Sequence, residues 1–538
     1  MTISNRNIIN SICDSIINVL ENKLFFLLII LLNLYPVLTN RFFATLDGPA
    51  HLYNAKLIND LLLNHNSITN SIFKFNIYIT PNCLGHFILS FFLIFLPAWM
   101  AEKALLILFL LLLPLSFRYL LTCLNANKIY SYFIIPFTYT FLFILGFYNF
   151  LIGLSFIFFG LGYFYKYLNQ DKLKHYFLLF IFSLLIYLSN PLLLILWLFC
   201  LFIIFFINIF QIFSIERNWY LKKNIRKALL TLTAFLPVVL LIFKYITIQH
   251  NSFGNRIPFN ELIKWLYKIR ALIVFSFGYE QRYTVILFII FIVLIISLLF
   301  NLINKNSRNS TYKRFISSIS ILIFTIVIFI LYFILPDEMA GGGYISIRLN
   351  LLLFLFFIIF LSYFEVNKIL LSSAFILTLI IHISLMSYHV INMNSLNKYT
   401  DEMYNCNKFI KENSTILTIN KTDNWMQSHL SNYAGLNNNI ILSDNYEAYN
   451  SYFPLLWKNN SFMNYKFFLE SSSGFDNKLI NTNRESQSSP DYILLYGNNP
   501  LKSDNCESEI KITIDTNYIL IHNSSDNFIK LFKLKSNQ

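Results

Sequence analysis

Charge is scarce in this sequence: Asp, Glu, Lys and Arg make up only 13% of its 538 residues, whereas 56% are hydrophobic. The mean hydropathy is +0.57. A chain this apolar and this poor in charge is not a soluble globular protein. Its apolar residues come in long unbroken runs, as in helices that cross a membrane. We therefore expect an all-α polytopic membrane protein.

Several chemical signatures are also missing. The six cysteines are scattered, at positions 13, 83, 123, 200, 406 and 506, without the spacing of a zinc or iron–sulfur site. The absence of a Walker motif and of a dinucleotide fingerprint argues against an ATP-driven transporter. No basic stripe suits nucleic acid, so no nucleic-acid partner is expected. A Cys406–Cys506 disulfide requires an extracytoplasmic C-terminal region, and the sequence alone leaves this pairing open.

The apolar runs are long enough to cross a hydrocarbon layer about 30 Å thick. They lie near residues 24–40, 84–100, 104–121, 132–147, 150–165, 176–190, 192–210, 228–248, 284–303, 315–335, 348–364 and 369–391. They predict about 11 to 13 transmembrane helices. The number of crossings within 132–165 stays open, because a break at Tyr148-Asn149-Phe150 divides that stretch into two short pieces.

Positive charge gathers in short loops, which the positive-inside rule places in the cytoplasm. These loops are Lys166–Lys174, Arg217–Lys227, Lys305–Arg314 and the single Lys368. The net charge of +14 then follows from topology. Residues 1–23 become a cytoplasmic N-terminal segment, and the first span is a retained anchor. The regions expected outside are 41–83, 249–283, 336–347 and everything after residue 392.

After residue 392 the hydrophobic runs shorten to strand length between polar residues. This pattern predicts a small extracytoplasmic α/β domain over 392–538, following a transmembrane domain over 24–391 with its first outside loop at 41–83. A helix is expected at Asn424–Tyr433. The expected strands are Thr415–Ile419, Asn439–Ser443, Asp491–Tyr496, Ile510–Ile514, Tyr518–His522 and Phe528–Leu534.

The pentapeptide Asp47-Gly48-Pro49-Ala50-His51 places an ionisable pair just after the first span. A helix that begins near Pro49 brings Asp47 and His51 onto neighbouring faces of its first turn. The apolar residues that follow have the period of an amphipathic helix lying along a membrane surface. Asp47 is either the N-cap of this helix or a general base or metal ligand. His51 is either a partner in that chemistry or an interfacial histidine.

A second candidate site is the loop that runs from Asp337 to Tyr344 and contains three successive glycines. Glycine lets a backbone approach a ligand closely, and the guanidinium of Arg348 can hold a phosphate through two parallel hydrogen bonds. The alternatives are a flexible turn and an interfacial arginine. Asp337 and Glu338 are candidate metal ligands or simply a solvated acidic loop.

Other candidates are weaker. His86 faces the same side as the first outside loop and is a candidate to line the same cavity. Arg118, Arg270, Glu280 and Arg282 are candidate lipid head-group contacts or interface anchors. Asp444 and Glu447 lie among aromatic residues that are able to stack on a sugar ring, although aromatic residues more often pack. These aromatic residues are Tyr446, Tyr449, Tyr452, Phe453 and Trp457.

Five motifs carry a resemblance that extends over nearly the whole chain. They are Asp47-Gly-Pro-Ala-His-Leu-Tyr-Asn54, Tyr148-Asn-Phe-Leu-Ile-Gly153, Gly341-Gly-Gly-Tyr-Ile-Ser-Ile-Arg348, Asp444-Asn-Tyr-Glu-Ala448 and Tyr452-Phe-Pro-Leu-Leu-Trp457. They are similar to a group of glycosyltransferase-like bacterial membrane proteins, frequent in Bacteroidota. More broadly, the chain resembles the type-C glycosyltransferases, which are polytopic enzymes that use polyprenyl-phosphate-linked sugars.

The resemblance implies that an acid of the first outside loop deprotonates the acceptor or helps to hold a divalent cation, Mg or Mn. Asp47 matches this acid, with His51 nearby in place of the usual second acidic residue. Cationic side chains would hold the lipid phosphate. The expected substrate-binding residues are Arg348, Tyr344, Gly342, Gly343, Tyr53, Asn54 and His86, and the metal candidates are Asp47, His51, Asp337 and Glu338.

The expected function is transfer of a sugar from a polyprenyl-phosphate donor to a lipid or glycan acceptor, at the outer face of the bacterial inner membrane. Asp47 and His51 are the expected catalytic residues, and membrane lipids are expected partners. A further hypothesis places Asp47 and Arg348 in one outward-facing cavity that holds the donor phosphate. The alternatives are a flippase or transporter of lipid-linked sugars and a degenerate glycosyltransferase-like protein. A transporter would more naturally carry ionisable residues in the middle of its spans.

Overall fold

The computed structural model describes residues 3–167, 170, 172–215, 220–248, 254–303, 308–450, 452–458, 469–472, 476–479, 489–501 and 505–535. The chain forms two compact units, and each unit combines two stretches of sequence. Unit 1 contains residues 1–36 and 107–390, and unit 2 contains residues 37–106 and 391–538. The contacts thus group the first outside loop of the sequence analysis with the C-terminal region.

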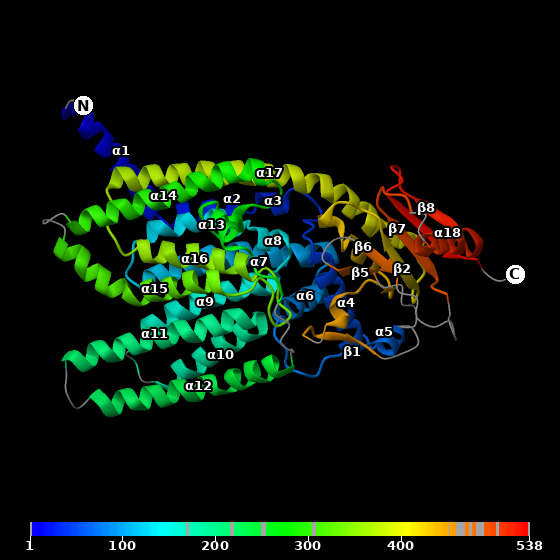
Figure 1. Ribbon diagram of the computed structural model, residues 1–538, viewed down its shortest axis with the longest axis horizontal. Coiled ribbons are helices and arrows are strands. Elements are labelled where there is room, and N and C mark those ends of the chain that lie inside the picture. Colours follow the sequence, from blue (N-terminus) through cyan, green and yellow to red (C-terminus); the bar gives the residue numbers. More distant parts are fainter. Residues whose placement is uncertain are drawn as a thin grey trace. The chain divides into compact units, whose positions relative to one another are not determined.

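Unit 1 consists of helices, many of them long (Figure 1). Three helices of the described chain, α3, α7 and α17, contain residues of both units. The bounds are α1 Ile3–Glu21, α2 Lys23–Leu32, α3 Tyr35–Leu38, α7 Ala98–Cys123, η1 Lys128–Thr138, α8 Phe141–Ile144, α9 Tyr148–Tyr167, α10 Leu173–Ser189, α11 Pro191–Ile215, α12 Tyr220–Ile248, α13 Phe259–Tyr267, η2 Arg270–Leu272, α14 Phe277–Ile303, α15 Arg308–Ile334, α16 Ile345–Leu361 and α17 Lys368–Cys406.

Six helices of the described chain are long and apolar enough to cross a membrane, and a seventh span results if the bent pair α1 and α2 counts as one. Five lie within α7, α9, α12, α14 and α15, and the sixth, Lys368–Phe409, covers α17 and η3 (Asn407–Phe409). Four shorter apolar helices accompany them, at Leu84–Phe95, Leu173–Ser189, Pro191–Ile207 and Ile345–Leu361. The expected polytopic helical class is confirmed.

The apolar run at 132–147 is not a spanning helix, contrary to the sequence prediction. It forms the 3-10 helix η1, which contains Pro136, followed by the single helical turn α8. Proline cannot donate the backbone hydrogen bond that a continuous α-helix requires at this point. The segment is buried against protein, which explains its apolar composition. Within 132–165, α9 is therefore the helix that is long and apolar enough to cross a membrane.

Small residues allow the helices that follow to pack closely. A Cβ atom at Gly160 of α9 would lie 2.6 Å from the indole ring of Trp197 in α11. A Cβ at Gly153 would lie 2.7 Å from the Cβ of Ser189 in α10. Helices in membranes associate largely through close packing at such small residues. The two glycines therefore fix the contacts of α9 with α10 and α11.

Unit 2 contains a five-stranded sheet in the order β3-β2-β7-β9-β8. Strands β3, β2 and β7 are parallel, and β9 and β8 continue the sheet in antiparallel fashion. Its other strands form the pairs β1–β4 and β5–β6. The strand bounds are β1 Phe73–Phe75, β2 Thr415–Asn420, β3 Ile441–Leu442, β4 Leu455–Trp457, β5 Leu469–Ser472, β6 Asp476–Leu479, β7 Tyr492–Tyr496, β8 Tyr518–Asn523 and β9 Ile529–Leu534.

Five of the six strands expected in this region are confirmed, as β2, β3, β7, β8 and β9. The sixth prediction was wrong, because Ile510–Ile514 lies in the helix α18, Asn505–Asn517. Ile510 and Ile514 are four residues apart and both pack on the hydrophobic core of the sheet, as the period of a helix allows. The expected helix Asn424–Tyr433 is replaced by two short 3-10 helices, η4 Trp425–Gln427 and η5 Leu430–Gly435.

The helix expected after Asp47 forms as α4, Gly48–Leu62, but it does not lie along a surface. Twelve of its fifteen residues are buried. It packs mainly against α6, Leu84–Phe95, and against η5. The remaining helices of unit 2 are α5 Ser67–Ile72, η3 Asn407–Phe409 and η6 Glu447–Tyr449. The small residues Gly48, Ala50 and Ala55 allow these neighbours to cover the helix on more than its apolar face.

Cys406 is buried and is a free thiol. The side chain of Cys506 lies outside the described part of the chain. Cys406 therefore does not form the disulfide with Cys506 that the sequence analysis considered.

Gly497 holds a turn that a larger residue cannot adopt. Its φ is +113°, and a Cβ atom would lie 2.2 Å from the carbonyl carbon of Lys421. We expect Gly497→Ala to lower the free energy of unfolding by more than about 2 kcal/mol, because both the backbone conformation and the contact exclude a side chain. Thermal unfolding of the full-length protein in detergent measures this loss.

The matched control is Gly278→Ala in α14, where the nearest atom to an added Cβ is 4.0 Å away. Alanine also has a higher helix propensity than glycine, so this variant should unfold at the same temperature as wild type or slightly above it. Equal melting of both variants would show that the turn at Gly497 tolerates a side chain.

Candidate functional site

The carboxylate of Asp47 is not used to cap α4, although Asp47 occupies the N-cap position. Its side chain makes no capping hydrogen bond. The hydroxyl of Thr45 instead accepts a hydrogen bond from the backbone N–H of Gly48, at 3.1 Å. Pro49 in the first turn lacks an N–H that would need a cap. The start of the helix is thus stabilised without Asp47, which leaves its carboxylate available for another role.

Asp47 lies among groups from distant parts of unit 2. The hydroxyl of Tyr446 donates a hydrogen bond to its carboxylate, and the Nε2 atom of His429 lies 3.7 Å from Oδ1. His429 stacks on the Tyr446 ring, with centroids 4.5 Å apart. Burial raises the pKa of Asp47 to about 6, an effect that the charge of His51 opposes in part. A buried carboxylate with a pKa near neutrality is suited to accept a proton.

His429 is the neutral partner in this arrangement. Burial lowers the pKa of its imidazole to about 4, so the ring carries no charge at neutral pH. Asp47 therefore has no cationic partner in His429. The charge of His51, and after it the Tyr446 hydroxyl, stabilise the negative charge of Asp47.

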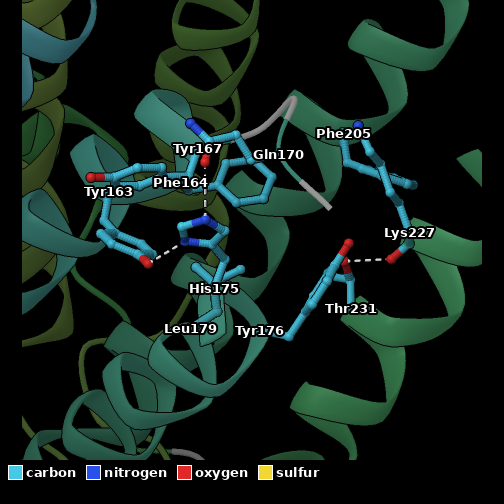
Figure 2. A pocket seen from close by; sticks show the side chains of 10 residues that line it. All are labelled: Tyr163, Phe164, Tyr167, Gln170, His175, Tyr176, Leu179, Phe205, Lys227 and Thr231. Atoms are coloured by element: carbon cyan, nitrogen blue, oxygen red, sulfur yellow. Dashed lines mark hydrogen bonds between the residues drawn. The ribbon is translucent and has the colours of Figure 1, made fainter. Parts of the chain in front are cut away.

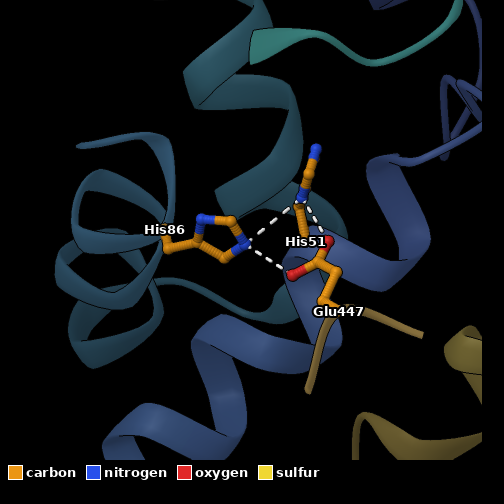
Figure 3. Close-up of side chains that lie close together, drawn as sticks. All are labelled: His51, His86 and Glu447. Carbon is orange, nitrogen blue, oxygen red and sulfur yellow. Dashed lines mark hydrogen bonds and ion pairs between the residues drawn. The ribbon is translucent and has the colours of Figure 1, made fainter. Parts of the chain in front are cut away.

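A second cluster joins His51 of α4, His86 of α6 and Glu447 of η6 (Figure 3). The Nδ1 atom of His51 lies 2.5 Å from Oε1 of Glu447, and the Nε2 atom of His86 lies 2.7 Å from Oε2. The two ring nitrogens are 3.2 Å from one another. All three residues are buried, and these atoms together form a group able to hold a metal ion.

Glu447 is ionised in this cluster. Burial alone would raise the pKa of its carboxyl, but the charges and hydrogen bonds of His51 and His86 outweigh that effect and bring the pKa down to about 2. A buried carboxylate is stable only with such partners. The ring of Phe453 covers the same histidines, with centroids 5.6 Å from His86 and 6.4 Å from His51.

Two residues expected to bind substrate, Tyr53 and Asn54, contact the strand and the loop that precede Glu447. The Tyr53 hydroxyl donates to the carbonyl of Ile440 at 2.9 Å and accepts from the backbone N–H of Leu442 at 3.1 Å. The side-chain amides of Asn54 and Asn445 exchange hydrogen bonds of 3.1 and 2.8 Å. Because Asn445 precedes Glu447 by two residues, these contacts position Glu447 opposite His51.

A separate group of cationic and aromatic residues lies in unit 1. Arg348 at the start of α16 is buried, with its guanidinium 4.7 Å from the ring centroid of Phe147 and 5.2 Å from that of Phe150. Arg270 lies 4.3 Å over the ring of Phe141. The ring of Tyr344 lies between the surroundings of the two arginines, since its centroid is 5.7 Å from that of Phe141 and 5.9 Å from that of Phe147.

Both guanidiniums are cations within a mainly aromatic environment. Burial lowers the pKa of Arg270 to about 10, against the charges of Glu280, Tyr344 and Asp337, so the group stays protonated at neutral pH. The Nε atom of Arg270 is buried and makes no hydrogen bond in the described chain. Arginine on aromatic faces is held in a fixed plane and can grip a phosphate with two hydrogen bonds. The cluster therefore has the chemistry of an anion site.

The glycine loop before α16 is a tight turn in which Met339 and Gly342 exchange backbone hydrogen bonds of 2.9 Å. A Cβ atom at Gly343 would meet nothing within 4 Å. Asp337 accepts a hydrogen bond from the backbone N–H of Ser346 at 3.0 Å, so its carboxylate caps α16. The backbone carbonyl of Glu338 accepts from the N–H of Gly254. Among the described residues, the possible metal-binding groups do not include Asp337 or Glu338.

The candidate residues thus fall into two groups. Asp47, His51, Tyr53, Asn54 and His86 belong to unit 2. Arg348, Tyr344, Gly342, Gly343, Asp337 and Glu338 belong to unit 1. The shared cavity of Asp47 and Arg348 stays a prediction.

Unit 1 also contains a pocket between α9, α10, α11 and α12 (Figure 2). His175 is fixed there, since its Nδ1 atom lies 2.6 Å from the Tyr163 hydroxyl and its Nε2 atom 3.2 Å from Oε1 of Gln170. Its ring stacks on Tyr167 with centroids 4.4 Å apart. Both ring nitrogens are thus engaged by protein groups, and the arrangement is that of a structural histidine.

Glu447 is the residue whose place the sequence missed. The sequence analysis set it among aromatic residues able to stack on a sugar, whereas the structure brings it to His51 and His86. The three residues are separated by 35 and 361 positions, so no local spacing connects them. The acidic residue inside the motif Asp444-Asn-Tyr-Glu-Ala448 was the only available signal.

The long apolar helices and the small sheet unit define the class: the chain is a polytopic membrane protein that shares its fold with ArnT, a protein of known structure. The crystal structure of ArnT from Cupriavidus metallidurans in the apo state matches it with a TM-score of 0.53 at 10% sequence identity, over 95% of this chain and 97% of that chain. The crystal structure of the same ArnT bound to undecaprenyl phosphate has a TM-score of 0.49, with the same identity and coverage. No protein-family model and no curated protein matches the sequence.

Proposed function

We propose that the protein is an integral membrane glycosyltransferase that moves a sugar from a polyprenyl-phosphate-linked donor to a lipid or glycan acceptor. The observation that carries this proposal is the carboxylate of Asp47, which is left out of the helix cap and has a pKa of about 6. The fold likeness to ArnT supports the enzyme class. The similarity of the five sequence motifs to glycosyltransferase-like bacterial membrane proteins supports the same class independently of the fold.

The proposed reaction divides its tasks between the two groups of residues. Asp47 accepts the proton of an acceptor hydroxyl, whose oxygen attacks the anomeric carbon of the sugar. The bond between that carbon and the phosphate oxygen breaks, and the polyprenyl phosphate leaves with the bonding electrons. Arg348 and Arg270 offer positive charge to the phosphate, as charge-assisted hydrogen bonds to phosphate are strong.

The proposed location is the bacterial inner membrane, with unit 2 on the extracytoplasmic side. The positive-inside distribution of the short loops supports this orientation. A polyprenyl-phosphate donor has its head group at the membrane surface, so an enzyme that uses it acts at that depth.

Transfer of labelled sugar by the purified protein tests the proposal. The protein is reconstituted in nanodiscs with a panel of polyprenyl-phosphate donors that carry pentoses or hexoses, and both labelled product and released polyprenyl phosphate are measured. Equal release of polyprenyl phosphate and product supports the transferase. Donor binding without release from any member of the panel would contradict it and favour a handler of lipid-linked sugars.

A further inference from the structure

Three donor atoms from three separate segments converge inside unit 2 (Figure 3). They are Nδ1 of His51, Nε2 of His86 and a carboxylate oxygen of Glu447, and all lie within 4.8 Å of one another. The side chains are 7%, 0% and 1% exposed. Burying an ionisable group costs free energy unless the group is paired or binds a metal ion, so three such groups in contact suggest a specific role.

Hydrogen bonding within the protein pairs both oxygens of Glu447 but brings two donor groups close together. A proton on each of the two ring nitrogens provides one donor for each oxygen of Glu447, at 2.5 and 2.7 Å. The two N–H groups then face one another across 3.2 Å. A cation between the three groups removes the conflict, because it accepts a lone pair from each of them at once.

We propose that His51, His86 and Glu447 bind a divalent transition-metal ion of the zinc class. Two imidazoles and one carboxylate are a ligand set that suits zinc, whereas Mg²⁺ prefers oxygen ligands and keeps several waters. Ligand atoms around tetrahedral zinc lie about 3.3 Å apart, so each contact in the cluster needs to open by less than about 1 Å. This site differs from the Mg or Mn site expected at Asp47.

The ion would connect three parts of unit 2. His51 lies in the first turn of α4, His86 in the first turn of α6, and Glu447 at the start of η6. The metal thus has a positioning role: it holds the beginning of α4, where Asp47 lies, against the loop that carries Tyr446. The site rests on these contacts and not on the proposed function, since a lipid-handling protein would bind the ion equally well.

Metal analysis of the full-length protein is the first test. The protein is purified with a tag that contains no histidine, stripped with a chelator and dialysed against buffered zinc, and its metal content is measured by mass spectrometry. We expect one zinc ion per chain. We also expect the zinc-loaded protein to unfold at a higher temperature than the stripped protein, because an ion that binds only the folded state stabilises it.

Variants identify the ligands. Glu447→Gln and His86→Ala should each weaken zinc binding by at least about a hundredfold, because the ligands share the affinity of a structural site. The matched control is His65→Ala, which changes an exposed histidine just beyond α4 and should leave zinc content unchanged. Equal zinc content in all three variants would overturn the proposal.

Cobalt binding to the wild-type protein tests the site even if a variant does not fold. Co²⁺ in the wild-type site should give visible absorption bands of a four- or five-coordinate ion without the charge-transfer band of a thiolate ligand. A spectrum without the thiolate band would show that the thiol of Cys83 does not bind the ion. Wild-type protein that holds less than stoichiometric Co²⁺ and zinc would show that the cluster is a hydrogen-bonded network without metal.

Discussion

Asp47→Asn is expected to reduce sugar transfer by about 10²- to 10⁴-fold, the usual contribution of a general base. Asparagine has the shape of the aspartate side chain but cannot accept a proton at neutral pH. The loss should appear in kcat, because donor binding does not depend on this proton transfer. Initial rates at saturating donor concentration, for wild type and variant in parallel, measure the change.

The same variant should gain stability, which separates a catalytic role from a cap. The pKa of Asp47 is raised from 3.8 to about 6, so ionisation of this carboxyl destabilises the folded state once the pH exceeds both values. The difference corresponds to about 3 kcal/mol at most, since one pKa unit is about 1.4 kcal/mol. Asn avoids this penalty, so the gain should be full above pH 6 and should vanish below pH 4.

Thermal unfolding at pH 8 and at pH 3.5 measures this gain, on protein treated with a chelator so that no bound cation changes the charge balance. Asp423→Asn is the control, because Asp423 is an exposed carboxylate of the same unit. It should change neither turnover nor stability. A lower melting temperature of Asp47→Asn with unchanged turnover would show that Asp47 serves the structure of the helix start and not the reaction.

The sequence predicted the helix start at Asp47 but not the use of its carboxylate. Aspartate before Gly-Pro is typical of an N-cap. The competing cap, the hydroxyl of Thr45, lies two residues earlier, and nothing in the local pattern tells which oxygen meets the N–H of Gly48. Such a choice depends on the tertiary contacts of Asp47 with Tyr446 and His429, almost 400 positions away.

The sequence pattern predicts the wrong structure where an apolar segment is buried inside the protein and not in the membrane. The segment 132–147 has the composition of a span but forms η1 and α8, buried inside unit 1. Apolar length alone does not distinguish a lipid environment from a protein interior. Pro136 is not a sufficient signal, because Pro114 and Pro237 lie inside the long apolar helices α7 and α12. Ile510 and Ile514 show a similar ambiguity at shorter range, since apolar residues four positions apart fit one face of a helix as well as one face of a strand.

Arg348→Lys is expected to raise the KM for the polyprenyl-phosphate donor by about 10- to 100-fold, with a smaller effect on kcat. Hydrogen bonds between charged groups contribute about 1.5–3 kcal/mol, and lysine keeps the charge but loses the two parallel N–H donors. It also loses the planar group that lies over Phe147 and Phe150. Donor titrations at fixed acceptor concentration measure KM and kcat separately.

An interfacial anchor would behave differently. Lysine extends to a membrane surface as well as arginine does, so an anchoring role predicts an unchanged KM and at most a shift in melting temperature. Arg256→Lys, at an exposed arginine of unit 1, is the control for a general change in surface charge. Asp47→Asn and Arg348→Lys should thus separate the two tasks of the proposed reaction: loss of kcat for the proposed proton acceptor, and loss of donor affinity for the proposed phosphate ligand.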